Sequence, residues 1–284
     1  IADLSAIIYY LQFFNNGMPF TPLEGVLISV ASIIFITGLN LATVKLFGEM
    51  EFWFAMIKII AIVVLIAVGA WMIFTGFTST AGEVAAFSNL WSHGGMFPTG
   101  LGGFLAGFQI AIFAFVGVEL VGTTAAETKD PEKNLPKAVN SIPIRIIIFY
   151  VLALVIVMAV TPWSKIDPSI SPFVNLFSQA GIAAAAIIMN LVVLSSVMSS
   201  MNSGVFSTSR MLFGLSRDEQ GPKSFGKLNK RAVPANALYF STVCLLAGAA
   251  LQYFVPNTVE AFTLATTLST ILFICVWLMI IWSY

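Results

Sequence analysis

Residues 51–74 read EFWFAMIKIIAIVVLIAVGAWMIF, and this stretch decides the fold. From Phe52 to Phe74 every residue is uncharged except Lys58. A helix needs about 20 predominantly apolar residues to cross the hydrocarbon core of a bilayer. The stretch therefore predicts a transmembrane helix that carries one ammonium group at membrane depth.

Lys58 has two interpretations. A charge near the membrane centre costs about 2.5–3.5 kcal/mol or more, and such residues usually face a bundle interior on an ion or substrate pathway. Alternatively, the lysine stem lies in lipid and the ammonium group reaches the nearer interface. Position in the sequence does not distinguish the two.

The composition extends the membrane assignment to the whole chain. Of the 284 residues, 58% are hydrophobic and 9% are charged, and the mean hydropathy is +0.95. A soluble domain has about 25% charged residues. The sequence therefore predicts an all-α, polytopic transmembrane helix bundle.

Several function classes find no support in these residues. No basic stripe suggests a nucleic-acid partner. Cys244 and Cys275 lie in apolar runs without metal-type spacing, and the single histidine, His93, lies in a loop. An intramembrane enzyme would need paired acids, a histidine cluster or a nucleophile beside a base. We therefore expect neither an enzyme nor a metal or cofactor site.

The apolar runs form about eight membrane segments of a single transmembrane domain. We expect them at 1–14 (truncated), 25–44, 53–74, 103–125, 143–161, 173–209, 235–255 and 260–284. Segment 173–209 has 37 uncharged residues, so it is either tilted, preceded by a short helix or extended past the membrane. Both ends of the chain are hydrophobic, and we expect an internal part of a longer protein.

Lysine and arginine alternate between successive loops. Loop 45–52 has Lys45, and loops 126–142 and 215–234 have three and five lysine or arginine residues; we call these three the basic loops. Loop 75–102 has no lysine or arginine, and loop 162–172 has only Lys165. Cytoplasmic loops carry an excess of these residues. The pattern predicts that the three basic loops are cytoplasmic and that their charges also meet anionic membrane lipids.

Segment 103–125 combines four glycines with Glu119. Glycine lowers the cost of leaving helical geometry, and the discontinuous helices of secondary transporters bind substrate where they unwind. The alternative is a small-residue packing face built on Gly103 and Gly107. Placing the Glu119 carboxylate inside the membrane costs more free energy than a helix-packing role alone would justify. The sequence therefore favours a broken helix.

Serines recur at helical spacing in 195–210. Ser196, Ser199 and Ser203 share one helix face. They serve either as polar glue between helices or as a lining that receives the Lys58 ammonium or a coupling ion.

Three strings resemble the bacterial amino-acid permeases of the amino acid–polyamine–organocation superfamily. They are NLATVKLFGEMEFWFAMIK (40–58), FAFVGVELVGTTAAETKDPEKNLPKAVNSIPIRI (113–146) and NSGVFSTSRMLFG (202–214). The resemblance covers essentially the whole chain. It implies part of a LeuT-like inverted-repeat fold, from late helix 3 to helix 10, without helices 1 and 2.

The resemblance also assigns candidate site residues. Phe113 matches an aromatic gate, and Ala114, Phe115, Val116 and Gly117 match the unwound part of a helix. The coupling candidates that it implies are Lys58, Glu119, Ser199, Asn202 and Ser203, with the last three facing Lys58.

We expect a proton-coupled symporter in the bacterial cytoplasmic (inner) membrane. By resemblance it would import small neutral amino acids such as D-serine, D-alanine and glycine. The alternatives are a permease for another amino acid (aromatic, proline, asparagine or similar) and a non-transport membrane protein such as a channel. A channel would need a water-lined pore with ionisable rings, whereas the charges here are isolated.

Overall fold

The structure is a computed structural model in which the described residues form helices and turns. It describes residues 1–42, 44–79, 82–123, 128, 130–168, 170–181, 183–255 and 257–283. Expected segments 25–44, 103–125, 173–209 and 260–284, and expected loops 75–102, 126–142 and 162–172, each contain residues outside this set. Within the described ranges, the β structure is limited to one isolated bridge, between Thr78 and Val84.

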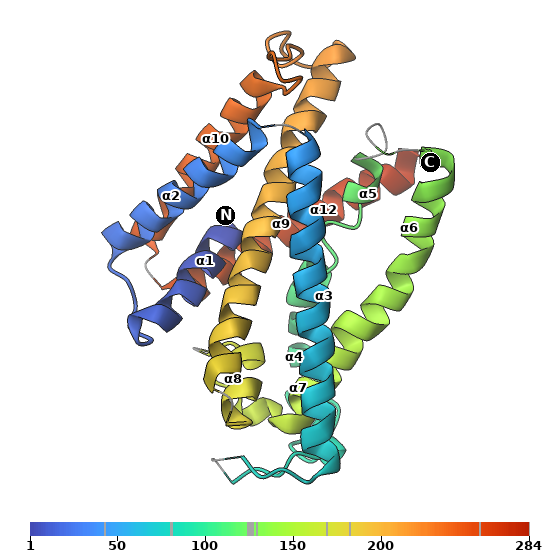
Figure 1. Cartoon of the computed structure of the whole chain (residues 1–284). Coiled ribbons are helices and arrows are strands. Elements are labelled where there is room, and N and C mark those ends of the chain that lie inside the picture. Colours follow the sequence, from blue (N-terminus) through green and yellow to red (C-terminus); the bar gives the residue numbers. More distant parts are fainter. Residues whose placement is uncertain are drawn as a thin grey trace. The chain divides into compact units, whose positions relative to one another are not determined.

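The helices follow one another along the chain (Figure 1). In order they are α1 (Ala2–Gln12), η1 (Phe13–Asn15), α2 (Pro22–Asn40), α3 (Val44–Phe74), η2 (Phe87–Leu90), α4 (Gly100–Phe113), α5 (Leu120–Thr123), α6 (Pro131–Ile146), η4 (Ile147–Leu152), α7 (Ala153–Val160), η5 (Trp163–Lys165), α8 (Pro172–Gln179), α9 (Ala183–Arg217), α10 (Ala235–Ala249), α11 (Leu251–Phe254) and α12 (Thr258–Ser283).

Five helical stretches among the described residues are long and apolar enough to cross a membrane. They are Pro22–Asn40, Gly48–Phe74, Pro131–Val160, Ala184–Arg217 and Thr258–Ser283. Large apolar side chains are exposed along them, including Phe74, which is 83% exposed. A soluble protein rarely exposes so much contiguous apolar surface. The helices confirm the predicted all-α transmembrane bundle.

The chain divides into two compact units. Unit 1 comprises Ile1–Ala55, Gly117–Leu135 and Leu194–Ser269, and unit 2 comprises Met56–Val116, Pro136–Val193 and Thr270–Tyr284. The boundaries fall within α3, α6, α9 and α12 and between α4 and α5. Each unit has its own apolar core.

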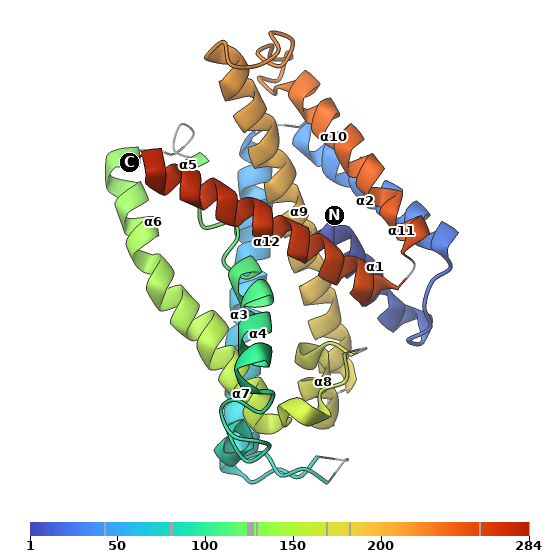
Figure 2. The same cartoon turned by 180° about the vertical axis from the view of Figure 1, so that it is seen from behind.

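The core of unit 1 forms where α2 lies alongside α10, as Figures 1 and 2 show. Ile33 and Ile36 of α2 and Leu238 of α10 are at most 1% exposed. The hydroxyl groups of Thr37 and Thr242 form a hydrogen bond of 3.0 Å between the same two helices. Threonine hydroxyls commonly join transmembrane helices in this way.

The core of unit 2 joins α3 to α7 and α8. Leu65 and Met72 of α3 pack in one cluster with Ile156 of α7 and Leu176 of α8. Gly69 allows this approach, because a Cβ atom there would overlap the side chain of Ile156 and lie 3.3 Å from Leu176. A small residue at a helix–helix contact is typical of membrane proteins.

The expectation of a loop at 45–52 is wrong, because α3 begins at Val44. The stretch VKLFGEME contains no proline and is rich in residues that favour helix. Its single glycine, Gly48, costs about 1 kcal/mol, and the long apolar helix that follows supplies the packing that outweighs this cost.

Segment 173–209 is divided between two helices. The short helix α8 ends at Gln179, and α9 begins at Ala183. Gly181 lies between them with φ of +76°, a conformation that glycine adopts without a Cβ clash. Of the three alternatives given for this segment, the structure contains the short preceding helix. In addition, α9 continues beyond residue 209 and ends at Arg217.

The stretch from α6 to α7 is helical throughout but changes its winding. Pro136 and Pro143 lie inside α6, and each removes a backbone donor from the helix. Residues Ile147–Leu152 (η4) then form a π-helix, which leads into α7. Wide turns of this kind occur mostly as short interruptions of α-helices.

Candidate functional site

The predicted break in segment 103–125 is present. Helix α4 ends at Phe113, α5 begins at Leu120, and residues 114–119 between them form turns. The N–H groups of Phe115 and Val116 bond to carbonyl groups three residues earlier, at 3.0 Å each. The regular ladder, in which each N–H bonds four residues back, therefore stops here.

Gly117 and Glu119 shape the break from within unit 1. Gly117 has φ of +105°, a backbone conformation that side chains with a Cβ rarely adopt. Its N–H group donates to both carboxylate oxygens of Glu119, at 3.1 and 3.2 Å. The positive φ of Gly117 thus directs its own N–H group toward the Glu119 carboxylate, which accepts a hydrogen bond from it.

The residues before Gly117 belong to unit 2. Phe113, Ala114 and Val116 are half-buried, whereas Phe115 is exposed and stacks on Tyr150 with ring centroids 6.0 Å apart. A helix end leaves peptide groups outside the ladder. Such groups hold the charged ends of substrates in the discontinuous helices of transporters.

A second polar site lies within unit 1, where α2, α3 and α9 contribute side chains to one hydrogen-bonded network. The Ser199 hydroxyl donates to Oε2 of Glu51 at 2.6 Å, and Nδ2 of Asn202 donates to Oε1 of Glu51 at 2.8 Å. Nδ2 of Asn40 donates to Oδ1 of Asn202 at 2.8 Å and to the Ile36 carbonyl at 3.0 Å. We call these four residues, Asn40, Glu51, Ser199 and Asn202, the Glu51 network.

The Glu51 network is shielded from solvent. Ser199, Asn202 and Asn40 are 1%, 2% and 3% exposed, and Glu51 is half-buried. Oδ1 of Asn40 is buried without a hydrogen-bond partner. Burying polar groups costs free energy unless they are paired, so a network of this size is an expensive feature for helices that are otherwise apolar.

The structure places the predicted coupling residues as follows. Ser199 and Asn202 belong to the Glu51 network, and Ser203 is half-buried on the same helix. Lys58 is half-buried and belongs to unit 2. That Ser199, Asn202 and Ser203 face Lys58 stays a prediction.

Glu51 and Asn40 are the functional candidates that the sequence reading missed. Two signals could have found them. Asn40 is a polar residue inside an apolar segment, and Glu51 precedes Lys58 by seven residues, which is two helical turns and therefore the same face of α3.

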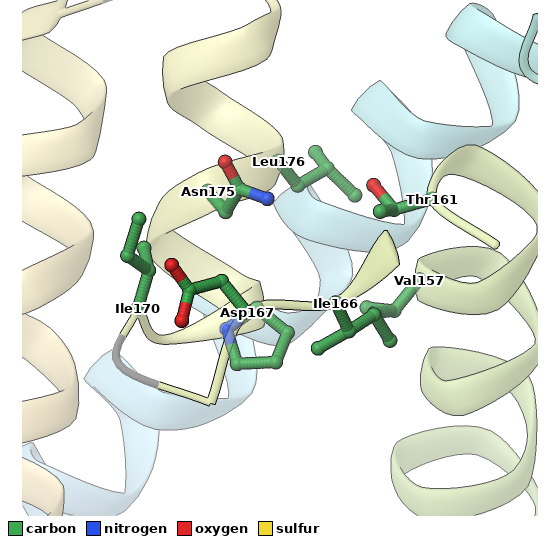
Figure 3. Close-up of a pocket in the computed structure, with 8 residues that line it drawn as sticks. Val157, Thr161, Ile166, Asp167, Ile170, Asn175 and Leu176 are labelled. Carbon is green, nitrogen blue, oxygen red and sulfur yellow. The ribbon is translucent and has the colours of Figure 1, made fainter. Parts of the chain in front are cut away.

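A small polar pocket lies in unit 2, between the end of α7 and the start of α8. It is lined by Val157, Thr161, Ile166, Asp167, Ile170, Pro172, Asn175 and Leu176. Figure 3 shows the Asp167 carboxylate and the Asn175 amide on one side and Thr161 beside Leu176 on the other. Ile166, Asp167 and Ile170 of this lining belong to loop 162–172, which connects two of the expected membrane segments. The pocket is therefore a poor match for a substrate site near the membrane centre.

Comparison with known proteins agrees with this architecture of long apolar helices with one helix break. The family model of the amino acid permeases matches residues 1–284. The chain is 60% identical over 284 residues to the D-serine/D-alanine/glycine transporter of Escherichia coli K12, covering all of this chain and 59% of that protein. It is 50% identical over 277 residues to the amino-acid permease AapA of Bacillus subtilis 168, covering 98% of this chain and 58% of the relative.

These matches identify both the kind of membrane protein and its family. The chain is a multi-pass protein of the bacterial inner membrane. It belongs to the amino acid permease family. It spans about three fifths of the length of the curated relatives that it matches.

Proposed function

We propose that this chain forms part of the transmembrane body of a secondary transporter that imports small neutral amino acids. The observation that carries the proposal is the 60% identity, over all 284 residues, to a relative named as a D-serine/D-alanine/glycine transporter. The family match over the whole chain favours a transporter over an enzyme or a channel.

The helix break at 114–119 is the proposed substrate-binding part of this chain. Phe113 would serve as the aromatic gate, and the peptide groups from Ala114 to Gly117 would bond the amino or carboxylate group of the substrate. The helical ladder stops at these residues, as expected where a transporter helix unwinds to meet its ligand. Alternating access would expose the site to one side of the membrane at a time.

Uptake of radiolabelled amino acids tests the proposal. The complete gene product that contains these residues is expressed in a host without its own glycine and D-serine uptake. We expect saturable uptake of glycine that excess D-serine and D-alanine suppress and that excess phenylalanine, proline or asparagine leaves unchanged. Suppression by phenylalanine, proline or asparagine, without suppression by D-serine or D-alanine, would favour a permease for another amino acid. Uptake that does not saturate would favour a channel.

Proton coupling through Lys58 is the finer part of the proposal. Lys58 is half-buried within an apolar helix, and a charge carried at membrane depth usually belongs to an ion or substrate pathway. A lysine that gains and loses a proton during the cycle would favour different helix arrangements in its two states. The Lys58→Met variant keeps the stem and removes the charge, so it should lose pH-dependent uptake and keep substrate binding. An unchanged rate and pH profile would instead support snorkelling.

A further inference from the structure

The Glu51 network has a fixed direction of donation. Asn40 donates through Nδ2 to Oδ1 of Asn202, so the Asn202 amide must turn its Nδ2 toward Glu51. An amide nitrogen donates and cannot accept. Oε1 of Glu51 therefore faces a group that can only donate, and this oxygen has to remain an acceptor.

The other carboxylate oxygen faces a group that can reverse. Oε2 accepts from the Ser199 hydroxyl at 2.6 Å, and a hydroxyl group both donates and accepts. If Oε2 gained a proton, the acid O–H could donate to the same serine oxygen over the same distance. The network can thus hold Glu51 in its ionised and its protonated form without moving a side chain.

The same geometry does not suit a metal ion. A hard cation is surrounded by oxygen ligands, whereas Asn202 presents an N–H group and both Glu51 oxygens already accept hydrogen bonds. Among the described residues, no group of three or more His, Cys, Asp or Glu side chains could hold a metal. A proton is the cation that fits.

The other charged groups on the elements that carry the network are few. Helix α3 has Glu49, which is exposed, and Lys58, two turns further along, besides Lys45; α9 has Arg210 and Arg217, and α2 has Glu24 at its opposite end. Asp3 of α1 accepts from Ser200 at 3.5 Å, next to Ser199. Arg231 donates to the Leu41 carbonyl at 3.5 Å, next to Asn40.

We propose that Glu51 is a proton-binding site, distinct from Lys58, and that its protonation state sets how firmly α3 is attached to α9 and, through Asn202, to α2. Hydrogen bonds to an ionised group are about twice as strong as those between neutral groups. Ionised Glu51 therefore ties the three helices together, and protonated Glu51 loosens them. The basic loops place the start of α3 and the end of α9 on the cytoplasmic side, so the proton would be exchanged from there.

Infrared difference spectroscopy tests proton binding without requiring transport. The complete gene product is titrated in lipid nanodiscs, and the carbonyl stretching band of a buried carboxylic acid is followed as the pH falls. We expect one such band that Glu51→Gln abolishes and Glu49→Gln leaves in place. The glutamine satisfies both Ser199 and Asn202, because it offers one acceptor and one donor.

A second pair of variants keeps the test decisive if Glu51→Gln does not fold. Ser199→Ala removes the partner of the acid O–H and should shift the frequency of the band, whereas Ser200→Ala, at the exposed neighbour, should not. A band unchanged in both Glu51→Gln and Ser199→Ala, or one that responds to sodium instead of pH, overturns the proposal.

Uptake measurements on the same variants connect the site to coupling, and this step rests on the proposed function. Glu51→Gln should lower pH-driven accumulation at least tenfold while exchange of internal for external substrate continues. Accumulation equal to that of the wild type would overturn the coupling role. A wild-type protein that transports no amino acid would refute the proposed function and leave the infrared result on proton binding to stand or fall by itself.

Discussion

Glu51, in the first turns of α3, and Glu119, at the break between α4 and α5, are both acidic residues close to apolar helices, yet they are partnered in opposite ways. Glu119 accepts from the N–H group of Gly117, two residues away. Glu51 accepts from Ser199 and Asn202, 148 and 151 positions away. A hydrogen bond to a residue two positions away stabilises the backbone of one helix break. Hydrogen bonds to distant residues hold separate helices together. Substitutions at the two sites should therefore affect different properties.

The largest effect is expected for Asn202→Leu. This change removes the donor to Glu51 and the acceptor of Asn40 at once, so the buried Asn40 amide and the half-buried Glu51 carboxylate each lose a partner. Each buried group left unsatisfied costs about 1–3 kcal/mol, so we expect a loss of about 2–4 kcal/mol in the free energy of unfolding, measured by denaturant titration in detergent. The control is Asn236→Leu, at an exposed asparagine that bonds the Ser224 carbonyl. Equal losses in the two variants would show that the Glu51 network contributes no special stability.

Gly117→Ala should have the next largest effect. An alanine at φ of +105° is strained, and strained backbone conformations cost about 1–3 kcal/mol. Gly107→Ala is the matched control, because that glycine is inside α4 with nothing within 4 Å of its would-be Cβ. There alanine should stabilise the helix by about 0.5–1 kcal/mol. A stabilised Gly117→Ala variant would contradict the described turn.

Glu119→Gln should cost less than either disruptive change. The glutamine oxygen can still accept from the Gly117 N–H, so only the difference between a charged and a neutral acceptor is lost, about 1 kcal/mol. Thermal unfolding of the purified variant should show a small decrease in Tm. A decrease as large as that of Asn202→Leu would mean that Glu119 has further partners and would remove the contrast between the two glutamates.

The smallest effect is expected at a surface ion pair. Lys165 and Glu83 approach to 3.8 Å in unit 2, and the lysine side chain is 58% exposed. Exposed pairs contribute about 0–1 kcal/mol because water and salt screen them. Lys165→Met should therefore change the free energy of unfolding by about 0.5 kcal/mol or less. A larger change would show that an exposed carboxylate such as Glu83 can contribute as much stability as the shielded Glu51. The contrast between Glu51 and surface carboxylates would then not depend on burial.

Local signals in the sequence predicted most of the fold and only one of the two polar sites. Apolar run length predicted an all-α protein with membrane-length helices, because bilayer thickness sets the length of apolar helix that is needed. Glycine and an acidic residue predicted the break near Gly117, because both act on the backbone close to their own positions. The prediction of a loop at 45–52 is wrong, because Lys45, Glu49 and Glu51 resemble loop residues by composition although they lie in the first turns of α3.

The Glu51 network could not be predicted in the same way. Its members are at positions 40, 51, 199 and 202, and what joins them is the packing of α9 against α2 and the first turns of α3. The family resemblance implies that Ser199 and Asn202 face Lys58, and it does not link them to Glu51. Nothing in the local pattern shows which distant carboxylate two polar residues will meet.

The π-helix at Ile147–Leu152 constrains how this part of the chain can evolve. A π turn holds one residue more than the regular turn it replaces, so deleting one residue there would restore a continuous α-helix. That deletion would leave the helix beyond it in phase, so Ala153, Ile156, Val157 and Val160, which form the buried face of α7, would stay buried. The same deletion within α7 itself would rotate the residues beyond it by about 100° and turn part of that face away from the core. Length changes of one residue should therefore be tolerated at the π turn in descendants of the gene and excluded from the regular helix that follows it.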